Sequence, residues 1–113
     1  MVTSIAPRGV PAWLHEGLAQ HFEGKDPEAA RRHVNAVRRR IPLTSLENGF
    51  ARLTTADAQV AYEESLLATE VIFERPGFGW TRLLSALAES NQVEHTLGSF
   101  GFSYADLEAG FAR

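Results

Sequence analysis

Apolar residues recur along most of this chain at intervals of three and four positions, which is the spacing of a helix with one buried face. No segment alternates apolar and polar residues in the way that a half-buried strand does. The pattern predicts an all-α fold of five or six helices in one compact domain. We expect residues 1–9 to form an irregular lead-in and residues 10–113 to form the single helical domain.

The first predicted helix starts at about Pro11, a residue that suits a first helical turn, and stops before Gly24. Glu16 lies on its polar side, together with Ala12, Ala19, Gln20 and Glu23. Glu16 should therefore project away from the core, toward solvent or toward a neighbouring element. The residues expected on the buried stripe are Val10, Trp13, Leu14, Gly17, Leu18 and Phe22.

Cap signals divide the rest of the chain. Asp26-Pro27-Glu28 opens a second helix that we expect to reach Ile41, because Pro42 constrains the residue before it. A loop with one short helical turn at 45–50 follows. A long helix is expected at 55–74, and it should be central because it is apolar around much of its circumference. Three more helices are expected: one at about 80–89, one that begins after a cap at Asn91, and one that begins after a cap at Ser103.

Composition narrows the possible chemistry. The 113 residues include no cysteine, so disulfides and thiolate metal sites are excluded, and any metal would need His, Asp or Glu. No apolar run approaches the roughly 20 residues of a membrane span. The net charge is −3, yet residues 31–40 read RRHVNAVRRR. This basic stretch suits a solvated helix face better than a nucleic-acid footprint, because no aromatic residue interleaves its arginines.

The dipeptide His15-Glu16 invites comparison with the HExxH zinc motif, in which two histidines four residues apart share one helix face. Ala19 stands where the second histidine would be. His15 and His21 are six residues apart, or about 240° around a helix, and cannot reach one metal together. His33 and His95 lack ligand-like spacing, and we expect Glu63 and Glu64 to be solvated. Neither a serine or cysteine nucleophile motif nor a phosphate loop is present, so the chain has no self-sufficient active site.

The stretch VPAWLHEGLAQHFEG at 10–24 nevertheless resembles a known pattern. It looks like the second zinc-site helix of the gluzincin metallopeptidases, above all the peptidase-MA-like family, whose outline is P-x-W-L-x-E-G-L-A-x-Y-x-E-G. Four downstream stretches also resemble that family: IPL at 41–43, AYEES at 61–65, the W-x-x-L-L-x-A-L-A-E run at 80–89, and GFSYADLE at 101–108.

The resemblance implies that this chain is the C-terminal, helical half of a gluzincin-type catalytic domain. Glu16 would be the third zinc ligand. Tyr62 would donate to the oxyanion of the tetrahedral intermediate, or would be simply a core aromatic with its hydroxyl at the edge. His21 stands where the family usually has Tyr and is not expected to be a ligand. The HExxH helix, with both histidine ligands and the general base, would lie upstream of residue 1. The complete domain would bind zinc and cleave a peptide or protein substrate.

The isolated chain is therefore expected to be inactive and free of zinc, since one carboxylate cannot hold the ion. Truncation would also expose apolar surface, from which we expect self-association. Two other functions remain open. One is a stand-alone helical interaction module that keeps the fold without the chemistry, for which Glu16 would be dispensable. The other is a basic-helix binder of nucleic acid that uses Arg31, Arg32, Arg38, Arg39 and Arg40.

Overall fold

The computed structural model describes residues 10–37, 41–75, 79–89 and 92–112. Within them the chain is all-helical, which confirms the predicted fold class. The elements are α1 (Ala12–Phe22), α2 (Pro27–Ala36), η1 (Leu43–Leu46), α3 (Thr55–Phe73), α4 (Trp80–Glu89), α5 (Val93–Ser99), α6 (Tyr104–Ala109) and η2 (Gly110–Ala112), where η marks a 3-10 helix.

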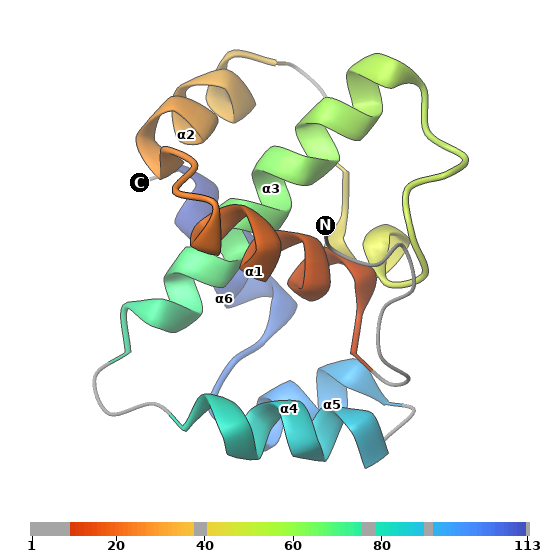
Figure 1. The fold of residues 1–113 in the computed structure, drawn as a ribbon, viewed down its shortest axis with the longest axis vertical. Coiled ribbons are helices and arrows are strands. Elements are labelled where there is room, and N and C mark those ends of the chain that lie inside the picture. Colours follow the sequence, from red (N-terminus) through yellow and green to blue (C-terminus); the bar gives the residue numbers. More distant parts are fainter. Residues whose placement is uncertain (1–9, 38–40, 76–78, 90–91, 113) are drawn as a thin grey trace.

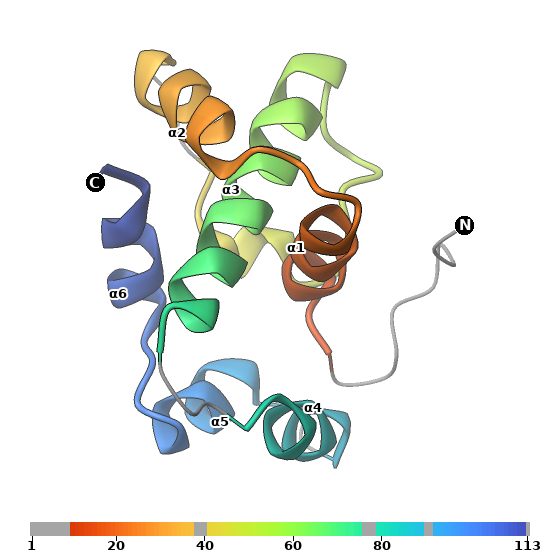
Figure 2. The same cartoon turned by 60° about the vertical axis from the view of Figure 1, so that its left-hand side comes forward.

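Helix α3 is the centre of the domain, as its sequence predicts. It packs against α1, α2 and α6, and it runs through the middle of the molecule in Figure 1, with α1 crossing in front of it. Figure 2 shows α3 between α1 on one side and α6 on the other. Almost all of α3 from Val60 to Thr69 is buried because neighbours cover it on several sides.

Side-chain caps fix where three helices begin. Asp26 accepts a hydrogen bond from the backbone N–H of Glu28, and Ser103 accepts one from that of Asp106. Both caps were predicted from the sequence, and Thr54 adds a third at the start of α3. Gly24 has a φ of 79°, a left-handed conformation that glycine adopts without strain, and the chain turns there after α1.

Two predicted boundaries are wrong. Helix α2 ends at Ala36 instead of reaching Ile41, and Val37 is already extended, with ψ at 147°. The short helical turn lies at Leu43–Leu46, earlier than the expected 45–50. The cause is tertiary: the N–H of Ile41 donates to the carboxylate of Glu64 on α3 instead of to a carbonyl within α2. The predicted cap at Asn91 lies outside the described residues.

Helices α4 and α5 form a pair below the α1 and α3 layer in Figure 1. Leu83, Leu87 and Leu97 are fully buried in this pair and join the common core. Arg75, just after α3, donates to the carbonyl of Phe100 at 2.8 Å and lies over the ring of Phe102. One guanidinium therefore ties the end of α3 to the turn after α5.

Candidate functional site

Glu16 lies on a helix whose first turn is tightly anchored. The N–H of Ala12 donates to the backbone carbonyl of Glu47 at 2.8 Å. The indole N–H of Trp13 donates to the Tyr104 hydroxyl at 3.1 Å, and that hydroxyl donates to the Glu47 carboxylate at 2.6 Å. Burial, followed by the hydrogen bond to Glu47, raises the pKa of Tyr104 far above its usual value. The Tyr104 hydroxyl therefore stays protonated and can link the two groups.

The residue after Glu16 fixes the helix laterally. A Cβ atom on Gly17 would lie 1.9 Å from the Thr69 hydroxyl oxygen and 2.4 Å from the Ser65 carbonyl oxygen. Only glycine allows this approach of α1 to α3. Ser65 and Thr69 are also small, and their hydroxyls bond carbonyls one turn back within α3. The backbone of Glu16 is therefore held in place by the hydrogen bonds of Ala12 and Trp13 on one side and by the close packing of Gly17 on the other.

The Glu16 side chain is half-buried. Its carboxylate has neither a hydrogen bond nor an ion pair to any described residue, although Glu47, Glu63, Glu64, Glu70 and Glu108 all have such partners. The fold therefore gives the Glu16 carboxylate no structural task that can be seen in the described ranges.

One side chain joins the two residues singled out from the sequence. The Gln20 amide on α1 donates to the backbone carbonyl of Tyr62 at 2.6 Å and to that of Glu16 at 3.3 Å. Tyr62 itself is 40% exposed and packs edge-on against Phe50, with ring centroids 4.9 Å apart. The Gln20 side chain thus bonds the backbone carbonyls of both candidate residues, Glu16 on its own helix and Tyr62 on the neighbouring helix α3.

Tyr62 lies in the wall of a cleft of about 630 Å³. The side chain of Glu16 is not part of its lining. The cleft is lined by residues from the end of α1, the start of α2 and the first half of α3: Gln20, Lys25, Asp26, Ala29, Ala30, Leu53, Thr55, Ala58, Gln59, Tyr62, Glu63 and Leu66.

Two histidines bind carboxylates of α3. His21 contacts Glu70 at 3.0 Å and stacks on Phe73 at 3.9 Å between ring centroids, and His33 contacts Glu63. His95 is exposed on α5. In the described part of the chain, no three His, Asp or Glu side chains gather as a metal site. Zinc does not fit these residues alone: Glu16 could supply one ligand, and two more would have to come from elsewhere.

The expectation that Glu63 and Glu64 are both solvated is wrong. Glu64 is fully buried and accepts from the N–H of Ile41, while Glu108 on α6 accepts from the N–H of Leu43 at 2.9 Å. Glu64 on α3 and Glu108 on α6 therefore both hold the backbone at the start of η1. Glu64 lies on the side of α3 that neighbouring elements cover, whereas Glu63, one residue before it, is partly exposed.

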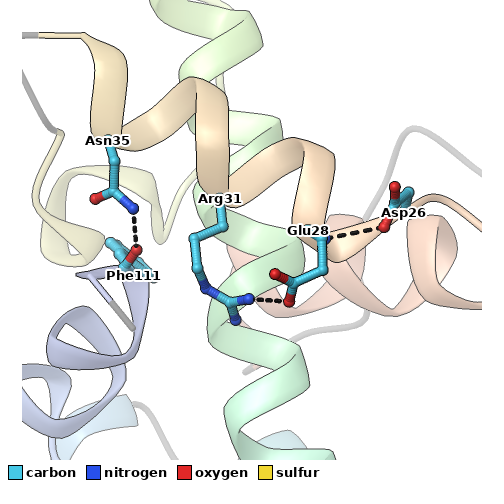
Figure 3. Close-up of polar contacts among 5 residues, drawn as sticks. All are labelled: Asp26, Glu28, Arg31, Asn35 and Phe111. Atoms are coloured by element: carbon cyan, nitrogen blue, oxygen red, sulfur yellow. Dashed lines mark hydrogen bonds and ion pairs between the residues drawn. The ribbon is translucent and has the colours of Figure 1, made fainter.

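The described part of the basic stretch is less available than the sequence indicates. Arg31 has only 12% of its side chain exposed and forms an ion pair with Glu28 on the same helix, as Figure 3 shows. Asn35 on the same helix donates to the carbonyl of Phe111 at 3.0 Å, which attaches α2 to η2. Arg32 is exposed, and residues 38–40 lie outside the described ranges.

None of the described helices is long and apolar enough to cross a membrane. The sequence matches no protein-family model, no curated protein and no solved structure among those with which it was compared. The gluzincin relationship therefore stays a prediction from the motif residues.

Proposed function

We propose that this chain is the C-terminal, helical part of a zinc-dependent metallopeptidase and that Glu16 supplies the third ligand to the metal. The observation that carries the proposal is the placement of Glu16. Its carboxylate has no partner among the described residues. The helix that carries it is held by the Ala12 hydrogen bond and by the close packing of Gly17 against α3. A metal ligand needs such preorganisation, because its geometry must be fixed by the surrounding shell.

The proposal requires two histidine ligands and a general base from a segment outside the described residues. Bound zinc would activate a water molecule for attack on a peptide bond. The role of this chain is to present the Glu16 carboxylate and to hold the Gln20 side chain between Glu16 and Tyr62.

Tyr62 is the second residue that we assign to the site. A phenol O–H is a suitable donor to a developing oxyanion. Support comes from its partial exposure and from the Gln20 bond to its carbonyl, which fixes that turn of α3 to α1. The neighbouring cleft would then receive part of the peptide or protein substrate.

The first experiment is an intact mass and zinc analysis of the natural gene product, purified from its source. We expect a mass well above 12.5 kDa, an added N-terminal HExxH sequence, and bound zinc. In that protein, Glu16→Ala should lower the zinc content strongly. Glu23→Ala, at the exposed C-cap position of the same helix, is the matched control and should leave zinc unchanged. Full zinc occupancy in Glu16→Ala, or a natural product that lacks HExxH, overturns the proposal.

A non-catalytic helical interaction module is the second candidate function. One observation favours it: Phe22, predicted to be buried, has 78% of its surface exposed at the end of α1. A large exposed aromatic side chain beside other aromatic rings is typical of a surface that binds a partner. This function requires no metal and predicts that Glu16→Ala has no effect on partner binding.

A further inference from the structure

Four aromatic rings meet where α1 and α3 end and α4 begins. We name His21, Phe22, Phe73 and Trp80 the aromatic cluster. Phe73 is its centre, stacked on His21 and 4.6 Å from Trp80 between ring centroids. Phe22 stands edge-on to His21 at 5.3 Å and to Phe73 at 6.4 Å. Phe22 is largely exposed, whereas the other three are partly covered, so the cluster has an open side.

The exposure of Phe22 follows from its position in the helix. It is the last residue of α1, and the chain turns away at Gly24 toward α2. Phe22 contacts the ring of Phe73 at the end of α3 edge-on and lies outside the buried core.

The surroundings of the cluster are electronegative for two reasons. The C-terminal ends of α1 and α3 lie on the same side of the molecule in Figure 1, and helix C-termini carry partial negative charge. Carboxylates also lie beside the cluster. A hollow of about 330 Å³ beside it is lined by His21, Pro27, Glu28, Arg31, Glu70, Phe73 and Glu74.

Carboxylates outnumber cations in this hollow. Arg31 forms its ion pair with Glu28, as Figure 3 shows, and His21 contacts Glu70, so these charges are partly balanced. Glu74, in the hollow, and the exposed Glu23, next to Phe22, leave the surroundings with an excess of negative charge. Acidic groups around exposed rings favour a cation, because the face of an aromatic ring attracts positive charge.

The same protein already uses this chemistry internally. Arg75 lies 4.2 Å above the Phe102 ring and donates to the carbonyls of Phe100 and Gly101, just after the end of α5. A guanidinium there satisfies both an aromatic face and carbonyl oxygens beyond a helix end. The aromatic cluster also presents aromatic rings, with carboxylates beside them and with an open side.

We propose that the aromatic cluster and its carboxylates form a docking surface for a lysine- or arginine-bearing segment of a partner protein. The cation would lie against the rings of Phe22 and Phe73, beside Glu70 and Glu74. Charge complementarity selects this occupant over an acidic or a purely apolar one. The inference does not depend on the peptidase proposal, since it uses neither Glu16 nor a metal.

The test uses the 113-residue chain and a blocked pentapeptide, acetyl-Gly-Lys-Gly-Arg-Gly-amide. The matched probe carries acetyl-lysine and citrulline in place of Lys and Arg, so that shape is kept and charge removed. Binding is followed by NMR shifts of the Phe22, Phe73 and Trp80 ring protons. We expect the cationic peptide alone to shift these resonances, with an affinity that falls as salt rises.

Phe22→Ala should weaken binding about three- to tenfold, the usual scale of a cation–π contact. Glu74→Gln should weaken it and reduce its salt dependence. Glu94→Gln, an exposed carboxylate on α5, is the matched control and should bind as the parent does. Circular dichroism of each variant establishes that the fold is intact.

Three results overturn the inference. One is equal binding of the charged and neutral peptides, and another is unchanged affinity in Phe22→Ala. The third is self-association that Phe22→Ala abolishes, combined with no peptide binding, which would make a second copy of the chain the true occupant.

Discussion

Gly17 lies so close to Thr69 that a Cβ atom at position 17 would be 1.9 Å from the Thr69 hydroxyl oxygen. The glycine follows Glu16 directly, so the W-L-x-E-G motif combines a candidate ligand with the contact that positions it. Any side chain at 17 would force α1 away from α3 and move Glu16 with it.

We therefore expect Gly17→Ala to destabilise the domain by about 2–3 kcal/mol, the scale of an overpacked core site. Combining it with Thr69→Ala should recover part of the loss, since the Ser65 carbonyl remains in the way. Gly98→Ala is the matched control: it is helical, with open space around it, and should be neutral or slightly stabilising. Urea unfolding of the four proteins measures these differences, and a Gly17→Ala variant as stable as the parent would contradict the packing argument.

Tyr104→Phe should lower the free energy of unfolding by about 1–3 kcal/mol. The substitution leaves the Trp13 N–H and the Glu47 carboxylate without the hydroxyl that joins them, and unpaired buried polar groups carry a cost on this scale. Tyr62→Phe is the control, because Tyr62 is 40% exposed and its ring contact with Phe50 does not depend on the hydroxyl. A double-mutant cycle with Glu47→Gln isolates the coupling between Tyr104 and Glu47, and additive effects would argue against the hydrogen bond.

The raised pKa of Tyr104 predicts a loss of stability in alkaline solution. Below about pH 10 the hydroxyl is protonated in both the folded and unfolded states, so its stabilising contribution is complete. Above that pH the unfolded state releases the proton while the folded state keeps it, and the free energy of unfolding must fall. Denaturant unfolding across this range in Tyr62→Phe, where Tyr104 is the remaining tyrosine, should show the fall. Tyr62→Phe/Tyr104→Phe should lose that part of the pH dependence.

The fold was predictable because local signals and helical periodicity agree for most of the chain. Asp26 and Ser103 cap helices as their sequence contexts predict, and the spacing from Thr55 to Phe73 identifies the central helix. Phe22 follows the buried stripe by spacing but lies one turn beyond the contact with the core. Periodicity predicts which side of a helix a residue lies on. It does not predict how far along the helix the neighbouring helix extends, and that decides whether Phe22 is covered.

Polar residues that act through tertiary contacts were harder to predict. Glu64 carries no local sign that it will meet the N–H of Ile41, 23 residues away, and Tyr104 none that it will meet Trp13, 91 residues away. Gln20 belongs to the polar face shared with Glu16, yet its bond to Tyr62 depends on how α1 crosses α3. A partial signal existed for Gly17, since a glycine within a buried helical stripe indicates close backbone approach.

Glu64→Ala should destabilise the domain by about 2–4 kcal/mol. It removes the acceptor for the N–H of Ile41 and leaves a cavity at a fully buried position. Glu63→Ala, the adjacent carboxylate on the same helix, is partly exposed and should cost less than about 1 kcal/mol. Thermal unfolding distinguishes the two variants. Equal losses would mean that burial of Glu64 does not decide its contribution.

Glu16→Ala should leave the stability of the isolated chain within about 0.5 kcal/mol of the parent. No described residue pairs with its carboxylate, and alanine is the better helix former, so folding loses nothing that the structure accounts for. Glu47→Ala, by contrast, removes a carboxylate that the Tyr104 hydroxyl binds and should cost about 1 kcal/mol or more. Chemical denaturation of the two variants measures both free energies of unfolding.

If Glu16→Ala lowered the free energy of unfolding as much as Glu47→Ala, Glu16 would have a structural role. The main argument that Glu16 is a metal ligand would then be lost. We expect Glu16→Ala to leave the stability of the isolated chain unchanged and to lower the zinc content of the complete protein. This combination is expected of a residue that the fold holds in place and that only the metal site uses.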